Sequence, residues 1–297
     1  MTATAPLLSE TEIRELVRSA THRPPAGPRQ RPPQQGRSGD QQAAVTGAGS
    51  DFAETRPYQA GDDPRRIDWR ATARSRAPLL RSYHTELSQP LYLVVDRGAS
   101  MRFATRRRLK VTQGVRCALS LAAAALAQGR EVAGVLLDHP CHWLPEQRGS
   151  QALVTFINLA NRPCPPIVPA AHDPSWERLL ASLRQRIPGG AELVLLSDFN
   201  DPGIMQSRTL GALGQHCAAQ ALIISDPAEK QLSRLQGLQL RWGRQQLLPG
   251  QQRLTKLADQ QAHWREALLR QLRRAGFDYR ELSTEVDDLT FLGGMIR

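Results

Sequence analysis

The sequence predicts a three-layer α/β domain with a mostly parallel sheet, and three observations lead to this prediction. An apolar run at 91–95 ends on Asp96 and is rich in Leu and Val, as expected of a strand buried on both faces. A second apolar run, 193–196, leads into Ser197 and Asp198. After residue 90 such runs alternate with amphipathic helical segments, which is typical of a parallel sheet covered by helices.

Size and charge limit the possible functions. The chain has 297 residues, 40% of them hydrophobic, which is enough for a sizeable core. Its formal net charge is +11, from 39 basic and 28 acidic residues, and nearly all of the positive charge is arginine. Such a balance suits nucleic acid, an anionic membrane, an acidic protein or simply surface Arg–carboxylate pairs. Aromatic residues do not interleave with the basic runs, which argues against a nucleic-acid partner.

The cysteines and the hydropathy indicate a compartment. Cys117, Cys141, Cys164 and Cys217 lack paired spacing, as expected in a reducing environment. The chain has no run of about 18 apolar residues and no charged-then-apolar leader. We therefore expect a soluble cytoplasmic protein with no membrane span.

Three regions differ in composition. Residues 1–50 are predicted to be a flexible segment rich in Arg and Pro, although Ser9 or Thr11 can cap a helix within its first 20 residues. Residues 51–89 form a dense arm that we expect to pack on the main domain. Residues 90–297 make the α/β domain itself.

The arm alternates acids and arginines around two aromatic residues. Asp63 and Pro64 are suited to the N-cap and first position of a short helix that ends near Ala73, and 79–84 is predicted to be a strand. Bidentate ion pairs would pin the arm to the main domain, and the alternative is a docking surface for another protein. The residues involved are Glu54, Arg56, Tyr58, Asp62, Asp63, Arg65, Asp68, Trp69 and Arg74.

The remaining elements follow in order from periodicity and end signals. Gly129 is predicted to end the first long helix, and Gly276 the last. Helices are expected at 108–128, 150–161, 173–187, 207–217 and 254–275, and strands at 132–137, 221–224, 238–242, 244–248 and 279–282.

A histidine and cysteine cluster follows the strand at 132–137. His139, Cys141 and His142 lie only a few residues apart, and no second ligand pair at zinc spacing is near. We expect a strand or turn there in preference to a zinc site.

Polar side chains are delivered to the carboxyl ends of two strands, where open parallel sheets bind ligands. Asp96, Ser100 and Asp198 could hold a hard divalent cation through oxygen ligands. Alternatively, they cap the following helices and bind nothing. The chain has no Gly-rich phosphate loop and no nucleophile elbow.

Residues 52–74 carry a longer pattern. It reads Glu54-x-Arg56-x-Tyr58, then Gly61-Asp62-Asp63-x-Arg65-x-Ile67-Asp68-Trp69 and Ala73-Arg74. This resembles the signature of bacterial domain-of-unknown-function family 58. Members of that family contain a von Willebrand factor A-like domain and are commonly encoded beside MoxR-type AAA+ ATPases. The resemblance implies a von Willebrand factor A-like fold, with an N-terminal arm.

The resemblance also implies a metal-ion-dependent adhesion site for Mg²⁺. Its pattern is Asp-x-Ser-x-Ser after the first strand, a Thr from a later loop and an Asp after a further strand. Asp96, Ser100 and Asp198 match, whereas Gly98 replaces a Ser and the stretch 170–173 lacks the Thr. With two oxygens lost, we expect a degenerate site that binds Mg²⁺ weakly or not at all.

Arg97 adds a positive charge beside this site, and if its side chain turns inward it could neutralise both acids. We expect a non-enzymatic interaction module, without a cofactor or small-molecule substrate, that acts with a MoxR-type AAA+ ATPase in assembly or maturation of other proteins. One alternative is a nucleic-acid-binding protein, whose affinity would fall steeply with salt. A second is a metal-dependent hydrolase using Asp96 and Asp198, which lacks an evident base and nucleophile.

Overall fold

A computed structural model of the chain falls into two compact units. The main unit comprises Met1–Pro28 and Gln89–Arg297, and the inserted unit comprises Arg29–Ser88. The structure describes residues 5–22, 46–47, 51–58, 67–75, 77–84, 89–138, 140–165, 176–234, 240–242, 245–247 and 251–296.

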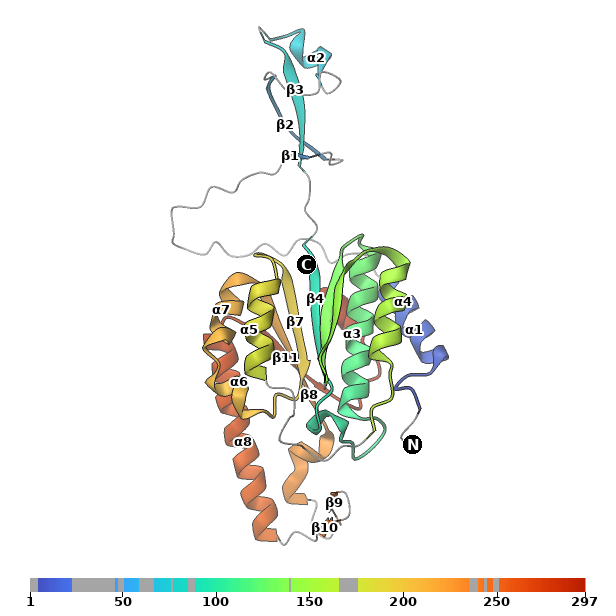
Figure 1. Ribbon diagram of the computed structural model, residues 1–297, viewed down its shortest axis with the longest axis vertical. Coiled ribbons are helices and arrows are strands. Elements are labelled where there is room, and N and C mark those ends of the chain that lie inside the picture. The colour runs from blue at the N-terminus through green and yellow to red at the C-terminus, as the bar shows by residue number, and fades with distance from the viewer. Residues whose placement is uncertain are drawn as a thin grey trace. The chain divides into compact units, whose positions relative to one another are not determined.

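The main unit is built on a six-stranded sheet with the order β11-β8-β7-β4-β5-β6 (Figure 1). All neighbouring pairs are parallel except β5 with β6, which is antiparallel. This confirms the predicted α/β class with a mostly parallel sheet. The strands are β4 (Leu91–Asp96), β5 (Val132–Leu137), β6 (His142–Gln147), β7 (Glu192–Ser197), β8 (Ala218–Ser225) and β11 (Asp278–Ser283).

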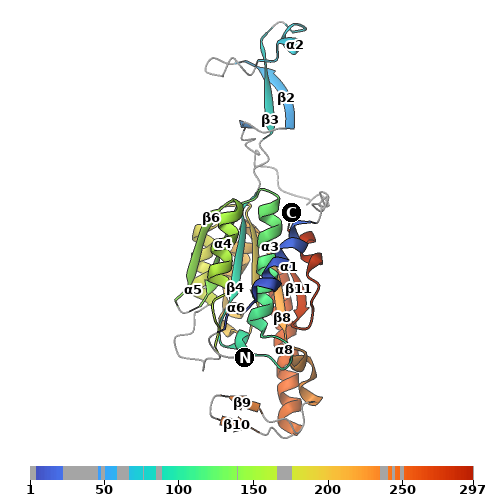
Figure 2. The same ribbon diagram turned by 90° about the vertical axis from the view of Figure 1, so that its right-hand side faces the viewer.

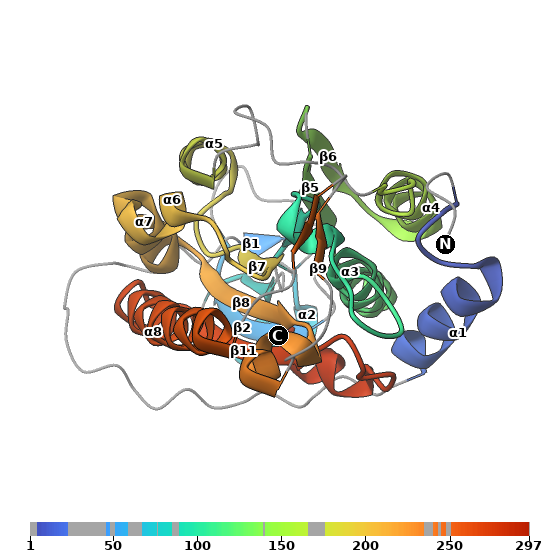
Figure 3. The ribbon, with the colours of Figure 1, turned by 90° about the horizontal axis from the view of Figure 1, so that it is seen from below.

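Helices cover both faces of this sheet, and Figures 2 and 3 show the three layers. On one face lie α1 (Glu10–Thr21), α3 (Lys110–Ala127) and α4 (Gly149–Ala160), together with the 3-10 turn η4 (Thr290–Gly294). On the other lie α5 (Trp176–Arg186), α6 (Pro202–Gln206), α7 (Arg208–His216) and α8 (Gln251–Arg274). Shorter elements are the 3-10 turns η2 (Ser100–Arg102) and η3 (Pro227–Arg234) and a hairpin of β9 (Leu240–Trp242) with β10 (Gln245–Leu247).

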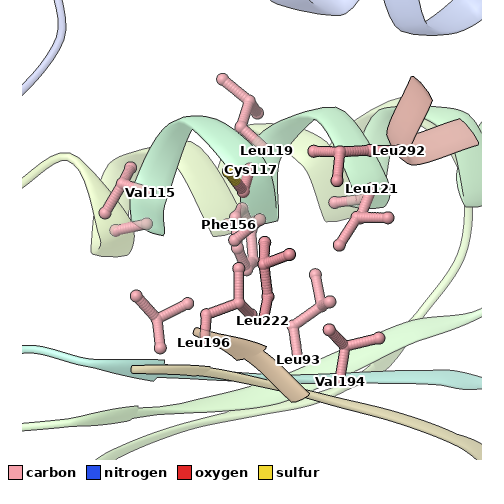
Figure 4. Packing of buried hydrophobic residues seen from close by; sticks show 14 of the residues in the cluster. Leu93, Val115, Cys117, Leu119, Leu121, Phe156, Val194, Leu196, Leu222 and Leu292 are labelled. Atoms are coloured by element: carbon pink, nitrogen blue, oxygen red, sulfur yellow. The ribbon is translucent and has the colours of Figure 1, made fainter. Parts of the chain in front are cut away.

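Alternation along the central strands divides the core in two. Leu93 and Val95 face the α3 side, whereas Tyr92 and Val94 face the α5 side. Figure 4 shows Leu93 beneath α3, beside leucines of β7 and β8. Each fully buried side chain of this kind contributes about 1.5–3 kcal/mol, so both faces of the sheet stabilise the fold.

The first helix belongs to the main unit. Ser9 caps α1 by accepting a hydrogen bond from the Glu12 N–H at 3.3 Å, and Leu16 is buried. The helix packs on α3, where Glu12 pairs with Arg116 at 2.7 Å. The prediction of one flexible segment over residues 1–50 is therefore wrong for its first part, while 23–45 lies outside the described residues.

Two predicted boundaries differ in the main unit. The predicted helix at 207–217 is the second of two, because Asp201 and Pro202 begin α6 before Ser207 separates it from α7. The predicted start of α5 at Asp173 lies outside the described residues, and the helix is seen from Trp176.

The inserted unit is an antiparallel sheet of order β1-β3-β2 with one short helix. Its elements are β1 (Thr46–Gly47), β2 (Asp51–Pro57), α2 (Trp69–Thr72) and β3 (Leu79–His84). The strand predicted at 79–84 is present, whereas the predicted cap at 63–64 lies outside the described residues. The described helix starts after Asp68, whose carboxylate accepts hydrogen bonds from two backbone N–H groups of α2.

Among the helices in the described ranges, none combines the length and the apolar character needed to cross a membrane.

Candidate functional site at the carboxyl edge of the sheet

Four neighbouring parallel strands each deliver an aspartate to the same edge. In sheet order β5-β4-β7-β8, these are Asp138, Asp96, Asp198 and Asp226. Each lies at the last position of its strand or one residue beyond it. The structure therefore brings the predicted pair Asp96 and Asp198 together, and it adds a carboxylate on either side.

Asp96 is held by neutral donors. It is 5% exposed, its Oδ1 accepts from the Gly98 N–H at 2.8 Å, and its Oδ2 accepts from Ser197 Oγ at 2.5 Å. Burial, together with the charge of nearby Asp198, raises the pKa of Asp96 to about 7. Near neutral pH this carboxyl is therefore partly protonated.

Asp198 is held by a cation. Its Oδ1 accepts from Ser100 Oγ at 3.0 Å and from the Asn200 N–H at 3.1 Å, while Oδ2 accepts from Lys110 Nζ at 2.7 Å. The same ammonium lies 2.5 Å from Glu229 Oε1, in η3. Lys110 and Asp198 have side chains that are 3% and 6% exposed, so the pair is almost fully withdrawn from water.

Lys110 stays charged in this setting. Burial opposes its charge, but the carboxylates of Asp198 and Glu229 outweigh burial and raise the pKa of Lys110. Lys110 is also the first residue of α3, where the helix dipole disfavours a cation. The two carboxylates are thus what keeps an ammonium at this position.

Arg97 does not face the two acids, which corrects the expectation that it could neutralise them. Its guanidinium pairs with Asp138 at 3.0 Å and donates to the carbonyl oxygens of Ala160 and Arg162 at 2.8 and 3.1 Å. Arg102 also pairs with Asp138, at 3.1 Å. The two arginines hold the segment that follows α4, leaving the Asp96–Asp198 pair to Lys110.

The loop between η2 and α3 binds Asp226, the fourth aspartate of the edge. Thr105 donates to Asp226 from its backbone N–H at 2.9 Å and from its hydroxyl. Arg108 pairs with Asp287 and donates to the Val286 carbonyl oxygen at 3.2 Å. Within this tied loop Phe103 is 38% exposed, and Lys110 Nζ lies 5.7 Å from the centroid of its ring.

A hexacoordinate cation does not fit the predicted ligands as they are arranged here. All four carboxylate oxygens of Asp96 and Asp198 accept hydrogen bonds from protein donors, and the Lys110 ammonium already lies against Asp198 Oδ2. A Cβ on Gly98, where the pattern expects serine, would lie 3.1 Å from Asp96 Oδ1. Within the described ranges, no group of three or more His, Cys, Asp or Glu side chains is arranged as a metal cage. The stretch 170–173, which would carry the threonine, lies outside those ranges.

A small polar cavity of about 20 Å³ adjoins the ion pair, enough for about one water molecule. Its lining includes Asp198, Glu229 and Trp264 of α8, whose indole N–H donates to the Phe199 carbonyl oxygen at 3.3 Å. Phe199 is fully buried with φ 54°, a left-handed conformation unusual for a bulky residue. Such strain persists only where surrounding structure fixes the turn, as it does here beside Asp198.

The predicted arm residues lie in the inserted unit. Asp68 caps α2, Trp69 is 69% exposed, Arg74 is exposed, and the Tyr58 N–H donates to the Pro78 carbonyl oxygen at 2.8 Å. Asp62, Asp63 and Arg65 lie outside the described residues, as do the side chains of Glu54 and Arg56. The ion-pair network of the arm stays a prediction.

Four residues of the site were not predicted from the sequence: Lys110, Asp138, Asp226 and Glu229. Asp226 was detectable, because it follows the apolar run 221–224 after one serine, as Asp198 follows 193–196. Asp138 was detectable too, because it follows 132–137 directly, as Asp96 follows 91–95. Lys110 carries a weaker signal, being one of only three lysines in an arginine-rich chain. Glu229 stands in a short turn and had no signal of its own.

Comparison with known proteins gives uncharacterized relatives. The chain is 29% identical over 196 residues to an uncharacterized protein of Mycobacterium tuberculosis and equally to one of Mycobacterium bovis. The match covers 65% of this chain and spans 61% of the length of those relatives.

Similar solved structures include a conserved hypothetical protein BatB from Bacteroides thetaiotaomicron and an aerotolerance-related membrane protein from Bacteroides fragilis. Their TM-scores are 0.43 and 0.41, at 9% and 12% identity. The matches cover 70% of this chain and 95% and 96% of those chains.

The family comparison covers more of the chain. The model described as protein of unknown function DUF58 matches residues 54–272, which takes in the arm signature and all four aspartates of the sheet edge. The chain therefore belongs to the DUF58 family of proteins of unknown function.

Proposed function

We propose that this protein is a non-enzymatic interaction module that acts with a MoxR-type AAA+ ATPase in the assembly or maturation of other proteins. The observation that carries the proposal is the saturation of the sheet edge by internal donors. Asp96, Asp138, Asp198 and Asp226 all accept hydrogen bonds from this chain's own side chains. An edge satisfied in this way is a fixed surface suited to recognition.

The same contacts weigh against a hydrolase. Ser100 Oγ donates to Asp198 Oδ1, but the other oxygen of that carboxylate is already bound to the Lys110 ammonium. In the described ranges, the histidine rings with hydrogen bonds contact backbone carbonyl oxygens, as His216 does with Ile187. A serine without an activated base is a poor nucleophile.

Phe103 gives the edge an apolar contact point. Its ring is partly exposed on a loop that Thr105 and Arg108 tie to the rest of the domain. Aromatic side chains held rigidly in this way are common centres of binding energy in interfaces. We expect the ATPase to cover Phe103. Four free cysteines accord with work in the reducing cytoplasm.

The test is binding of the full chain to the cognate ATPase, measured by biolayer interferometry without nucleotide. Phe103→Arg should weaken binding at least tenfold, about 1.4 kcal/mol, because it places a charge in the contact. Val154→Arg on α4, another exposed apolar position, is the matched control and should bind like the wild type.

Two results would contradict the proposal. One is no measurable complex with the ATPase. The other is tight binding to an unrelated nucleic acid that weakens steeply with salt, which would favour the basic surface instead.

A further inference from the structure

The positive charge beside Asp198 at this sheet edge comes from a side chain of the protein itself, Lys110. Lys110 Nζ lies 2.7 Å from Asp198 Oδ2 and 2.5 Å from Glu229 Oε1, with its side chain 3% exposed. An ammonium in contact with two carboxylates and closed off from water occupies the type of position that a bound metal ion would otherwise take.

The charges around it show why a cation is needed. Asp198, Glu229 and Asp226 lie near one another, since Glu229 Oε2 also accepts from the Asp226 N–H at 3.0 Å. Arg97, which follows Asp96 in sequence, is committed to Asp138, and Arg108, two residues before Lys110, pairs with Asp287. Without Lys110, Asp198 would lose its cation and remain buried.

A divalent ion and the ammonium exclude each other here. Mg²⁺ requires about six oxygen ligands at short range, and Asp198 Oδ2 and Glu229 Oε1 are already in contact with Nζ. Ser100 Oγ donates its proton to Asp198 but keeps its lone pairs, so it would be a further oxygen ligand for an ion in this place. The ion could enter only if the lysine amine left.

We infer that Lys110 is a built-in replacement for a divalent cation, and that removing its amine turns the same edge into a divalent-cation site. The ligands would be the carboxylates of Asp198 and Glu229 and the hydroxyl of Ser100, with water in the space vacated by the lysine side chain. The inference is independent of the ATPase partnership, because it concerns what the isolated chain binds.

The experiment compares Lys110 variants of the full chain in chelator, in millimolar Mg²⁺ and in Mn²⁺. Bound Mn²⁺ is counted by electron paramagnetic resonance, and the melting temperature is read in parallel. The wild type should bind no Mn²⁺ at the edge and show no shift with Mg²⁺. Lys110→Ala should melt lower in chelator, bind one Mn²⁺ and recover about 5 °C or more in Mg²⁺.

Matched variants separate the cause. Lys110→Met removes the charge but keeps the volume, so it should be destabilised without recovery in Mg²⁺. Lys110→Arg keeps a cation and should bind no metal. Asp198→Asn in the Lys110→Ala background should abolish Mn²⁺ binding, because it removes the central ligand charge.

If Lys110→Ala fails to fold, Lys110→Ser takes its place, because it also removes the amine and adds a hydroxyl ligand. A folded Lys110→Ala or Lys110→Ser protein that binds no Mn²⁺ would overturn the inference. So would failure of both to fold in either metal, or Asp198-dependent Mn²⁺ binding by the wild type.

Discussion

Asp96 and Asp198 lie at the carboxyl ends of neighbouring strands, but their carboxylates are bound by different kinds of donor. Asp198 shares a buried ammonium, whereas Asp96 has only the hydroxyl of Ser197 and the N–H of Gly98 as close donors. In the folded state Asp96 therefore favours its protonated form, and its pKa of about 7 lies above the value of about 4 in an unfolded chain.

This difference predicts a pH dependence of stability. Between the unfolded and folded pKa values the folded protein binds more protons, so the free energy of unfolding should fall as pH rises from about 4 to about 7 and then level off. Asp96→Asn should remove that decline, which amounts to a few kcal/mol over the window. Urea unfolding across this pH range measures both proteins. If the free energy of unfolding had the same pH dependence in the wild type and in Asp96→Asn, folding would not raise the pKa of Asp96.

The residues of the site differ in how far the sequence could predict them. Asp96 and Asp198 follow apolar strands, so local pattern was enough to place them at one edge. The neutralising cation was not predictable in this way, because Lys110 is 88 residues from Asp198 along the chain. The expectation that Arg97 could neutralise Asp96 and Asp198 was wrong, because neighbouring residues at a strand end point to opposite faces of the sheet.

At the scale of elements, α7 meets the end of α8 at a glycine. A Cβ on Gly214 would lie 1.8 Å from the Ala275 carbonyl oxygen, whereas a Cβ on Gly211 in the same helix meets no atom within 4 Å. The sequence shows two equivalent glycines in a helix, and only the packing distinguishes them.

Gly214→Ala should therefore destabilise the protein by about 3 kcal/mol or more, since two backbones must separate. Gly211→Ala should stabilise it by about 0.5–1 kcal/mol, because alanine is the better helix former. Chemical unfolding of the two variants beside the wild type measures both effects. Equal effects would contradict the close contact of α7 with Ala275.

At the scale of the whole molecule, the order of strands and helices after residue 90 was readable mainly because the four central strands β4, β5, β7 and β8 are largely apolar runs, whereas the edge strands β6 and β11 are mostly polar. The packing of α1 on α3 could not be predicted, because Glu12 and Arg116, which pair between these helices, are far apart in sequence. Composition marked residues 21–50 as linker-like, but it could not show that the helix before them joins the main unit.

A further prediction about the whole molecule comes from the sequence: the arm is expected to pack on the main domain. If Asp62 and Arg65 make buried pairs, replacing either with alanine should lower stability by a few kcal/mol. Differential scanning calorimetry of both variants tests this, with Glu10→Ala, which removes an exposed pair with Arg14, as the control. Unchanged melting in both arm variants would contradict the predicted packing.

The docking of α1 has a consequence for folding rate. During synthesis α1 leaves the ribosome well before the residues it contacts: Arg116 follows Glu12 by about a hundred residues, and Asn161 follows Leu8, which it bonds, by 153. Contacts between such distant segments slow folding, because a long loop must close before they form. The helix must therefore wait, unprotected, while the whole inserted unit is made, and this interval is where a chaperone would be of most use to the chain.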